Sequence, residues 1–306
     1  MAWSDWIGRT ESSVDTITVA PALRLAATLD RDDPPPQPGD PLPPLWHWLY
    51  CLPLHRQSEL DADGHARRGA FLPPVPLPRR LYAGGRIDIH DALRFGDRIE
   101  RLSRVETISE KQGRTGPLVF VTVRHRIVGP RGLALVEDHD IVYRDRPMPL
   151  ASGPAARAGD APTAGDGAPP APAPAIESRR ADWRRQVRPD ESLLFRYSAL
   201  TFNAYRIHYD RPYATGVQGY AGLVVHAPLV ATLLADLVRR QLPLADISSF
   251  AFRALRPLVD GSPIELCGRM ADEGQSARLW AVDAEGLVAF EATAGFRAAV
   301  SLERSA

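Results

Sequence analysis

Residues 197–210 read Tyr197-Ser-Ala-Leu-Thr-Phe-Asn-Ala-Tyr-Arg-Ile-His-Tyr-Asp210, and residues 219–229 read Gly219-Tyr-Ala-Gly-Leu-Val-Val-His-Ala-Pro-Leu229. An apolar, strand-like start at Leu193 leads into the first stretch, which is dense in polar, titratable and aromatic side chains. Such a mixture at a strand end indicates a site rather than a core. Asn203 and His208 are five residues apart, which would turn them about 140° from each other on a helix, so a loop is needed to point both at one place. In the second stretch, Pro228 suits the first turn of an apolar helix, where its missing N–H costs nothing.

The same order of elements occurs in both halves of the chain. Ala-Leu-Arg, followed by a Gly/Asp turn and a strand, occurs at 92–94 and at 254–256, downstream of an apolar helix-like run in each half. Strands are expected at 85–90, 98–109, 118–128 and 133–143 in the first half and at 248–256, 264–271, 277–283 and 287–296 in the second. The helix-like runs are residues 45–52 and 228–240, and a further helix near 18–29 has Thr18 as its N-cap. One helix followed by an antiparallel meander, repeated twice, is an α+β architecture.

A change in composition separates the two halves. Ala, Pro and Gly fill 20 of the 26 positions of residues 151–176. Such a stretch cannot bury enough surface to offset its chain entropy, which predicts a partly extended linker. We therefore expect a degenerate N-terminal unit at 1–148, a linker at 149–178 and a catalytic unit at 179–306. The proline-rich insertion 53–80 of the first half is expected to be a stiff lid or pocket wall.

Composition excludes several classes of function. Among 306 residues, 37 are Lys or Arg and 37 are Asp or Glu, so no basic excess is available to neutralise nucleic-acid phosphates. No apolar run approaches the roughly 18 residues of a membrane span, and the N-terminal segment has no apolar signal-peptide core, which favours a cytoplasmic protein. Cys51 and Cys267 are too few for a disulfide scaffold or a zinc site. P-loop, GxGxxG, GxSxG and HExxH motifs are absent, so neither a metal nor an organic cofactor is expected.

The two quoted stretches resemble the MaoC-like hydratase/dehydratase family, and within it the branch of mesaconyl-C4-CoA (3-methylfumaryl-CoA) hydratases and type 2 hydroxyacyl-thioester dehydratases. The first half resembles the degenerate N-terminal domain of these proteins in residues 71–80 and 82–86. The resemblance implies a double hotdog, in which two antiparallel sheets each wrap a long helix and join as a pseudo-dimer. It also implies an acyl-CoA substrate, and a homodimer as a further assembly.

The resemblance also implies the site residues. Asn203 stands where many (R)-specific enoyl-CoA hydratases have an aspartate, and it cannot act as a base. Either His208 is the base and Asn203 orients water, or the Asp210 carboxylate contributes. A neutral histidine suits proton transfer near pH 7, and the free backbone N–H groups around Ala227 at a helix start can form an oxyanion hole. Further contacts to the substrate are expected from Arg206, Tyr209, Asp210 and His226.

The expected activity is a hydro-lyase acting at the 2,3-double bond of an enoyl-CoA, with mesaconyl-C4-CoA converted to citramalyl-CoA. Alternatives are a dehydratase of itaconyl-CoA or of 3-hydroxyacyl thioesters, a hotdog thioesterase, and a non-catalytic acyl-CoA binding module. A thioesterase commonly has an acidic residue on the long helix, and residues 228–240 offer only Asp236, several turns from the start. The first half has no counterpart of the Asn203/His208 pair, so one active site per chain is expected.

Overall fold

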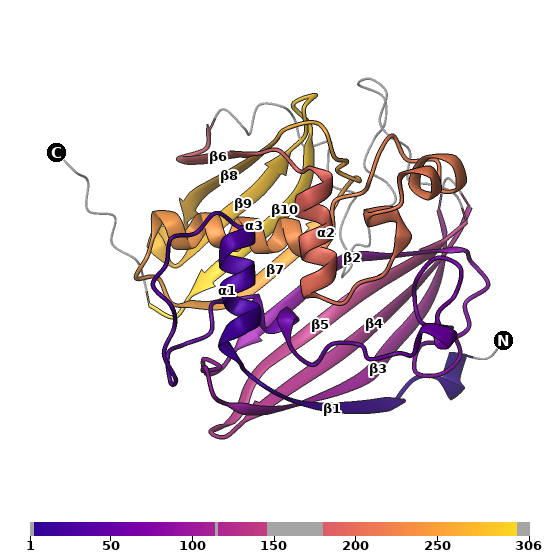
Figure 1. Ribbon diagram of the computed structural model, residues 1–306, viewed down its shortest axis with the longest axis horizontal. Helices are drawn as coiled ribbons and strands as arrows, with labels where there is room; N and C mark the ends of the chain where they lie inside the picture. The colour runs from indigo at the N-terminus through magenta and orange to yellow at the C-terminus, as the bar shows by residue number, and fades with distance from the viewer. Residues whose placement is uncertain (1–2, 114–115, 146–179, 299–306) are drawn as a thin grey trace.

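The computed structural model describes residues 3–113, 116–145 and 180–298 (Figure 1). The predicted linker at 149–178 therefore lies outside the described residues. One ten-stranded sheet runs through the molecule in the order β1-β3-β4-β5-β2-β7-β10-β9-β8-β6. Its strands are β1 (Thr10–Thr16), β2 (Arg79–Ile89), β3 (Arg98–Gly113), β4 (Gly116–Gly129), β5 (Gly132–Arg144), β6 (Trp183–Val187), β7 (Ile247–Ala254), β8 (Ile264–Ala271), β9 (Ser276–Val282) and β10 (Val288–Phe296).

The two halves of the sheet have the same internal order. In each half the five strands lie in the spatial order first, third, fourth, fifth, second, and the second strands, β2 and β7, pair antiparallel in the middle. Gly84 of β2 permits this pairing, because a Cβ there would overlap the carbonyl oxygen of Phe252. Pairing covers an edge that each half would otherwise expose. The predicted joining of two halves edge to edge is confirmed.

The eight strands predicted from alternation are all present, with ends that differ by a few residues. Two strands were not predicted, namely β1 and β6, which lie at the outer edges of the sheet. Their sequences, TESSVDT and WRRQV, are mostly polar, and most of their side chains are partly or fully exposed. Edge strands of this kind have no apolar run to reveal them.

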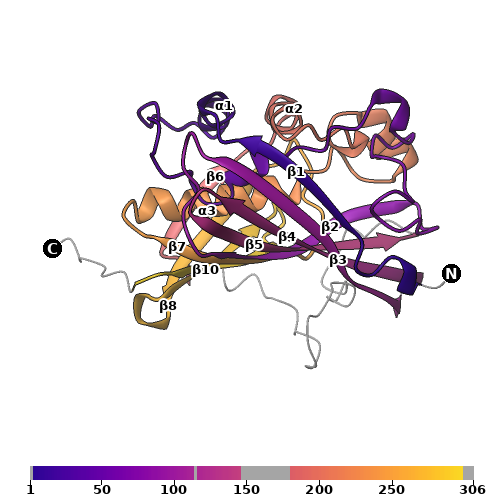
Figure 2. The ribbon, with the colours of Figure 1, turned by 90° about the horizontal axis from the view of Figure 1, so that it is seen from below.

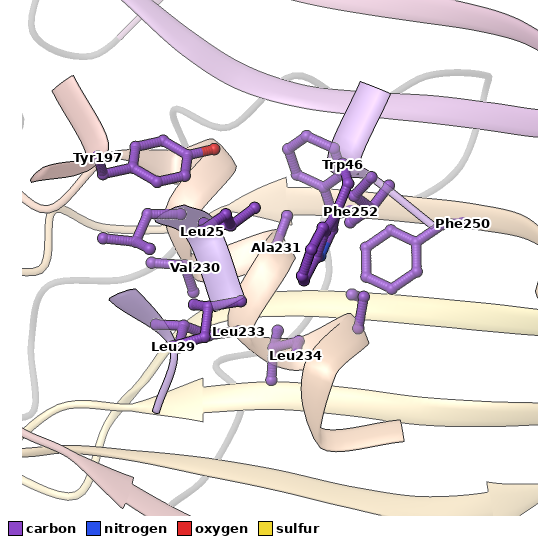
Figure 3. Packing of buried hydrophobic residues seen from close by; sticks show 14 of the residues in the cluster. Leu25, Leu29, Trp46, Tyr197, Val230, Ala231, Leu233, Leu234, Phe250 and Phe252 are labelled. Carbon is purple, nitrogen blue, oxygen red and sulfur yellow. The ribbon is translucent and has the colours of Figure 1, made fainter. Parts of the chain in front are cut away.

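The second half wraps a long helix as predicted. Helix α3 (Ala227–Gln241) begins with Pro228 in its first turn and buries ten consecutive side chains from Leu229 to Val238. Helices α1 (Val19–Thr28) and α2 (Glu191–Leu200) lie on the same side of the sheet (Figure 2). In Figure 3 the α1 side chain of Leu25 lies beside Val230 of α3, within one continuous apolar core.

The first half does not wrap a long helix, so the prediction of one in residues 45–52 is wrong. Only a short 3-10 turn, η2 (Trp46–Leu49), forms there. Leu45 and Cys51, on either side of it, have positive φ angles of 68° and 52°, which interrupt a helix. Trp46 fills part of the space beside Phe250 and Phe252 (Figure 3). The first-half sheet is therefore left partly uncovered by helix.

Candidate active site

A loop after α2 positions the predicted catalytic residues. The strand-like start predicted at Leu193 is instead helix α2, because the Asp190 side chain caps it by accepting a hydrogen bond from the Leu193 N–H at 2.8 Å. Phe202 has a positive φ of 50° and ends the helical path. The chain then turns through η5 (Arg206–His208), which carries His208 inward. A capped helix and a sharp exit thus place the loop beside the start of α3.

The His208 imidazole is held as a neutral base. Its Nδ1 lies 2.7 Å from the carbonyl oxygen of Val224, and because a carbonyl can only accept, Nδ1 carries the proton and Nε2 has a free lone pair. Burial lowers the pKa of His208 to about 4, although the hydrogen bond to Val224 opposes this shift. The ring is therefore uncharged at neutral pH. His208 lines a cavity of about 960 Å³.

His226 stacks on His208 with ring centroids 3.6 Å apart and lies at the N-cap of α3. Its Nε2 is 2.8 Å from the Ser198 hydroxyl, but it makes no capping hydrogen bond. Burial lowers the pKa of His226 well below its usual value, and the nearby His208 lowers it further. His226 is thus a neutral ring that supports one face of His208.

Asn203 and Ala227 line the same cavity as His208. The Asn203 side-chain oxygen accepts a hydrogen bond from the Tyr205 N–H at 3.0 Å, so it fixes the loop. Its amide nitrogen has no hydrogen-bond partner among the described residues. Ala227 is the first residue of α3, whose N-terminal N–H groups carry partial positive charge. The structure brings together Asn203, His208 and Ala227, which the sequence predicted as orienting group, base and oxyanion hole, respectively.

The remaining predicted residues are placed differently. Arg206 and Asp210 form an ion pair at 2.8 Å, and neither belongs to the described residues that line the cavity. The Asp210 side chain also accepts from the Tyr213 N–H at 3.0 Å. Hydrogen bonding to Tyr213, and then to Arg206, lowers the pKa of Asp210. Tyr209 lines the cavity and is 47% exposed, so it lies at the mouth.

The cavity has a volume of about 960 Å³ and takes side chains from both halves. On the first-half side, sequence reasoning missed a buried network centred on Glu137. This carboxylate accepts hydrogen bonds from Trp48 Nε1 at 3.0 Å and Tyr82 OH at 2.7 Å, and it lies 3.1 Å from His47 Nε2. Glu137 and His139 are two residues apart on β5, so both side chains point to the same face of the sheet, which is apolar along the rest of the strand. These two polar residues on an otherwise apolar face are the signal that could have revealed the network.

The insertion 53–80 forms a wall of this cavity. Its Asp63 carbonyl accepts a hydrogen bond from the Arg206 N–H at 2.9 Å, and its His65 ring lies 4.0 Å from the Tyr205 ring. Gly64 has a φ of 92°, and a Cβ there would overlap the Ala204 carbonyl oxygen. The insertion therefore packs directly against the loop that carries His208.

Asp236 of α3 is fully buried away from the cavity. It is bound by Arg31 at 2.6 Å, Arg185 at 2.8 Å and Arg240 at 2.7 Å. A carboxylate engaged by three guanidinium groups outside the cavity lining is not available to a thioester.

Among the described residues, no cluster of His, Cys, Asp or Glu is suited to hold a metal ion. No helix in the described ranges is long and apolar enough to cross a membrane.

Residues 45–260 match the family model described as hydroxyacyl-thioester dehydratase type 2. The chain belongs to this family. It is 45% identical over 292 residues to the mesaconyl-C(4)-CoA hydratase of Chloroflexus aurantiacus, covering 95% of this chain and 96% of that protein. It is 25% identical over 256 residues to the mitochondrial hydroxyacyl-thioester dehydratase type 2 of Schizosaccharomyces pombe, covering 74% and 77% of the two chains. The predicted family is confirmed.

Solved structures confirm the double hotdog fold expected of the family. A MaoC-like dehydratase superimposes with a TM-score of 0.67 at 14% identity, covering 97% of this chain and 99% of that one. A Mycobacterium tuberculosis protein described as a double hotdog superimposes with a TM-score of 0.56 at 14% identity, covering 95% and 96%. At such low identity these likenesses show the fold alone.

Proposed function

We propose that the protein is a hydro-lyase that hydrates the 2,3-double bond of an enoyl-CoA thioester, with mesaconyl-C4-CoA as substrate and citramalyl-CoA as product. One observation carries the proposal: the buried, neutral His208 has its Nε2 lone pair free and lies in the same cavity as the start of α3. The choice of substrate rests on the 45% identity to the mesaconyl-C(4)-CoA hydratase.

The chemistry needs one base and one stabiliser of negative charge. Nε2 of His208 takes a proton from water while the water oxygen bonds to C3 of the acyl chain, and the double-bond electrons move toward the thioester oxygen. Backbone N–H groups around Ala227 stabilise the resulting enolate. The enolate then re-forms the carbonyl as C2 takes the proton back from the His208 imidazolium. The sum is the addition of one water, with His208 returned to its neutral form.

Asn203 and His226 act as supports in this scheme. The free amide of Asn203 orients the attacking water, and the stacked His226 ring keeps His208 in place. Because Asp210 pairs with Arg206, it takes no part. We propose that neither a metal nor an organic cofactor is needed, that residues 1–148 supply only the cavity wall, and that residues 179–306 hold the catalytic groups. A cytoplasmic homodimer remains part of the proposal.

Incubation with mesaconyl-C4-CoA and crotonyl-CoA tests the activity. Loss of the enoyl-thioester absorbance without release of a free thiol is the expected result. Release of free CoA would indicate a thioesterase instead. Binding of either thioester without any change in it would indicate a non-catalytic module.

A further inference from the structure

The inner face of the first-half sheet is polar where the same face of the second half is apolar. In β10 the residues at alternate positions, Phe290, Ala292 and Ala294, are buried in the core with α3. In β5 the alternate positions carry Glu137 and His139. Since no long helix covers this part of the sheet, these side chains line the cavity instead.

The hydrogen bonds of this polar face are incomplete. Glu137 is satisfied by its three partners, but neither ring nitrogen of His139 has a hydrogen-bond partner among the described residues. The His139 ring stacks on Tyr82 with centroids 3.6 Å apart. Burial lowers the pKa of His139 to about 3, although the nearby Glu137 carboxylate opposes this shift. The ring is therefore neutral. A neutral imidazole with free nitrogens facing a cavity is available to a polar ligand.

Two of the five arginines that line the cavity have guanidinium groups engaged by other described residues. Arg68 donates to the carbonyl oxygens of the chain between Val75 and Pro78, and Arg256 pairs with Asp283 at 3.3 Å. Arg101 lies near Glu11, another cavity residue. Burial raises the pKa of Glu11, and the charge of Arg101 opposes this shift. Neither Arg101 nor Arg67, which also lines the cavity, forms an ion pair among the described residues.

Arg80 is a third such arginine. It lines the cavity from β2, two residues from Tyr82, and forms no ion pair among the described residues. Its charge lowers the pKa of both His139 and His65, and His65 is also within range of His208. Arg80 therefore shares the cavity with histidines of the polar face and of the insertion, and its charge acts on both. The charge of Arg80 also acts to lower the pKa of Asp63, which is hydrogen-bonded to His65 at 3.0 Å, and that of Tyr143.

We propose that Arg80 and His139 form a subsite for a carboxylate on the acyl chain, so that the cavity selects enoyl thioesters with a charged acyl end. This proposal rests on the proposed function. An apolar chain would cover the partly exposed Arg80 and His139 side chains without offering either one a hydrogen bond, which disfavours such a chain. A carboxylate attached to C3 would be held next to the carbon that water attacks, and the subsite would also orient that carbon.

Two pairs of ligands test the subsite. Succinyl-CoA and butyryl-CoA have acyl chains of the same length, and only succinyl-CoA carries a carboxylate, so their affinities measured by calorimetry report the subsite without catalysis. Wild-type protein is expected to prefer succinyl-CoA, and Arg80→Gln to reduce that preference by about 10- to 100-fold, as expected for the loss of one charged hydrogen bond. Arg80→Lys should restore part of it. The ratio of kcat/KM for mesaconyl-C4-CoA to that for crotonyl-CoA should fall in parallel.

Arg124→Gln is the matched control, because Arg124 points to the opposite face of the same sheet, where it pairs with Asp138 at 2.8 Å. It should keep the wild-type preference. An unchanged succinyl-to-butyryl ratio in folded Arg80→Gln protein would overturn the subsite, as would wild-type protein with no preference. Hydration of crotonyl-CoA in that case would leave the proposed function standing. Preference for succinyl-CoA without hydration of either enoyl-CoA would instead uphold the subsite and refute the hydratase.

Discussion

The two halves of the sheet have the same strand order but opposite inner faces. The second half buries α3 against apolar side chains, whereas the described part of the first half has the shorter helix α1, the short turn η2 and a polar face that opens on a cavity. The proposed base and the helix start belong to the second half, and the partly uncovered sheet to the first. The absence of a long central helix from the described part of the first half leaves room that we propose holds the acyl chain.

Of the predicted changes in activity, the largest should follow removal of the proposed base, His208. His208→Ala should lower kcat by about 100-fold or more, the usual range for a lost general base. Asn203→Ala should lower it less, and Asn203→Asp should retain some activity, because Asn203 only orients water. In the first half, His139→Gln should change KM more than kcat. Steady-state rates on mesaconyl-C4-CoA measure these effects, with circular dichroism as the folding control.

Equal losses of kcat in His208→Ala and His139→Gln would contradict the division of roles between the halves. Near wild-type turnover in folded His208→Ala protein would remove the proposed base altogether.

Both halves should respond to acid, because each holds neutral histidines. Burial lowers the pKa of His208 in the second half and of His125 in the first to about 4. The unfolded chain binds these protons below about pH 6.5, and the folded chain does so only near pH 4. The free energy of unfolding should therefore fall across this window, by about 1.4 kcal/mol per pH unit for each histidine.

Urea unfolding at several pH values between 7 and about 4 measures this loss. His125→Gln removes one buried histidine and should make the decline less steep. A midpoint that stays constant over the whole window would show that these rings are not buried in their neutral form.

The contact between the insertion 53–80 of the first half and the loop that carries His208 can be disturbed at one glycine, Gly64. A Cβ at Gly64 would overlap the Ala204 carbonyl oxygen, so Gly64→Ala should shift the loop that carries His208 and lower kcat by about 10-fold or more, the order of loss expected for misplaced catalytic groups. Gly39 has a similar φ, 91° against 92°, but open space around it. Gly39→Ala therefore has the same backbone strain without the overlap, and its kcat should be near that of wild type. If both variants lose activity to the same degree, the contact does not position the loop.

The smallest effect is expected at Arg206. It forms an ion pair with Asp210 outside the cavity lining. An exposed pair of this kind contributes little, so Arg206→Gln should leave kcat/KM for mesaconyl-C4-CoA within about threefold of wild type. A loss comparable with that of His208→Ala would place Arg206 in contact with the substrate and would return Asp210 to the list of possible bases.

The sequence predicted the elements that have an apolar pattern of their own. Alternation located the eight inner strands, and the apolar run with Pro228 located α3. The edge strands β1 and β6 were missed because their residues are mostly polar. Residues 45–52 are as apolar as a buried helix, but positive φ angles at Leu45 and Cys51 prevent a long helix there. These backbone angles depend on tertiary contacts, so the sequence alone did not predict them.

The site shows the same limit. Asn203, His208 and Ala227 lie in two consecutive stretches, so a motif could join them. Arg80, Glu137 and His139 come from two strands of the other half and line one cavity only because β2 pairs with β5. No spacing along the chain connects Arg80 to the other two. Asp210 looked suitable by its position alone, and only the structure shows its ion pair with Arg206.

The reaction in water enriched in oxygen-18 tests the central claim most directly. Mesaconyl-C4-CoA incubated with the protein should yield a CoA thioester that has gained the mass of one labelled water, with the label at C3 and no free thiol. His208→Ala should yield little of this product in the same time. Labelled free acid together with free CoA, or a substrate of unchanged mass, would contradict a hydratase whose base is His208.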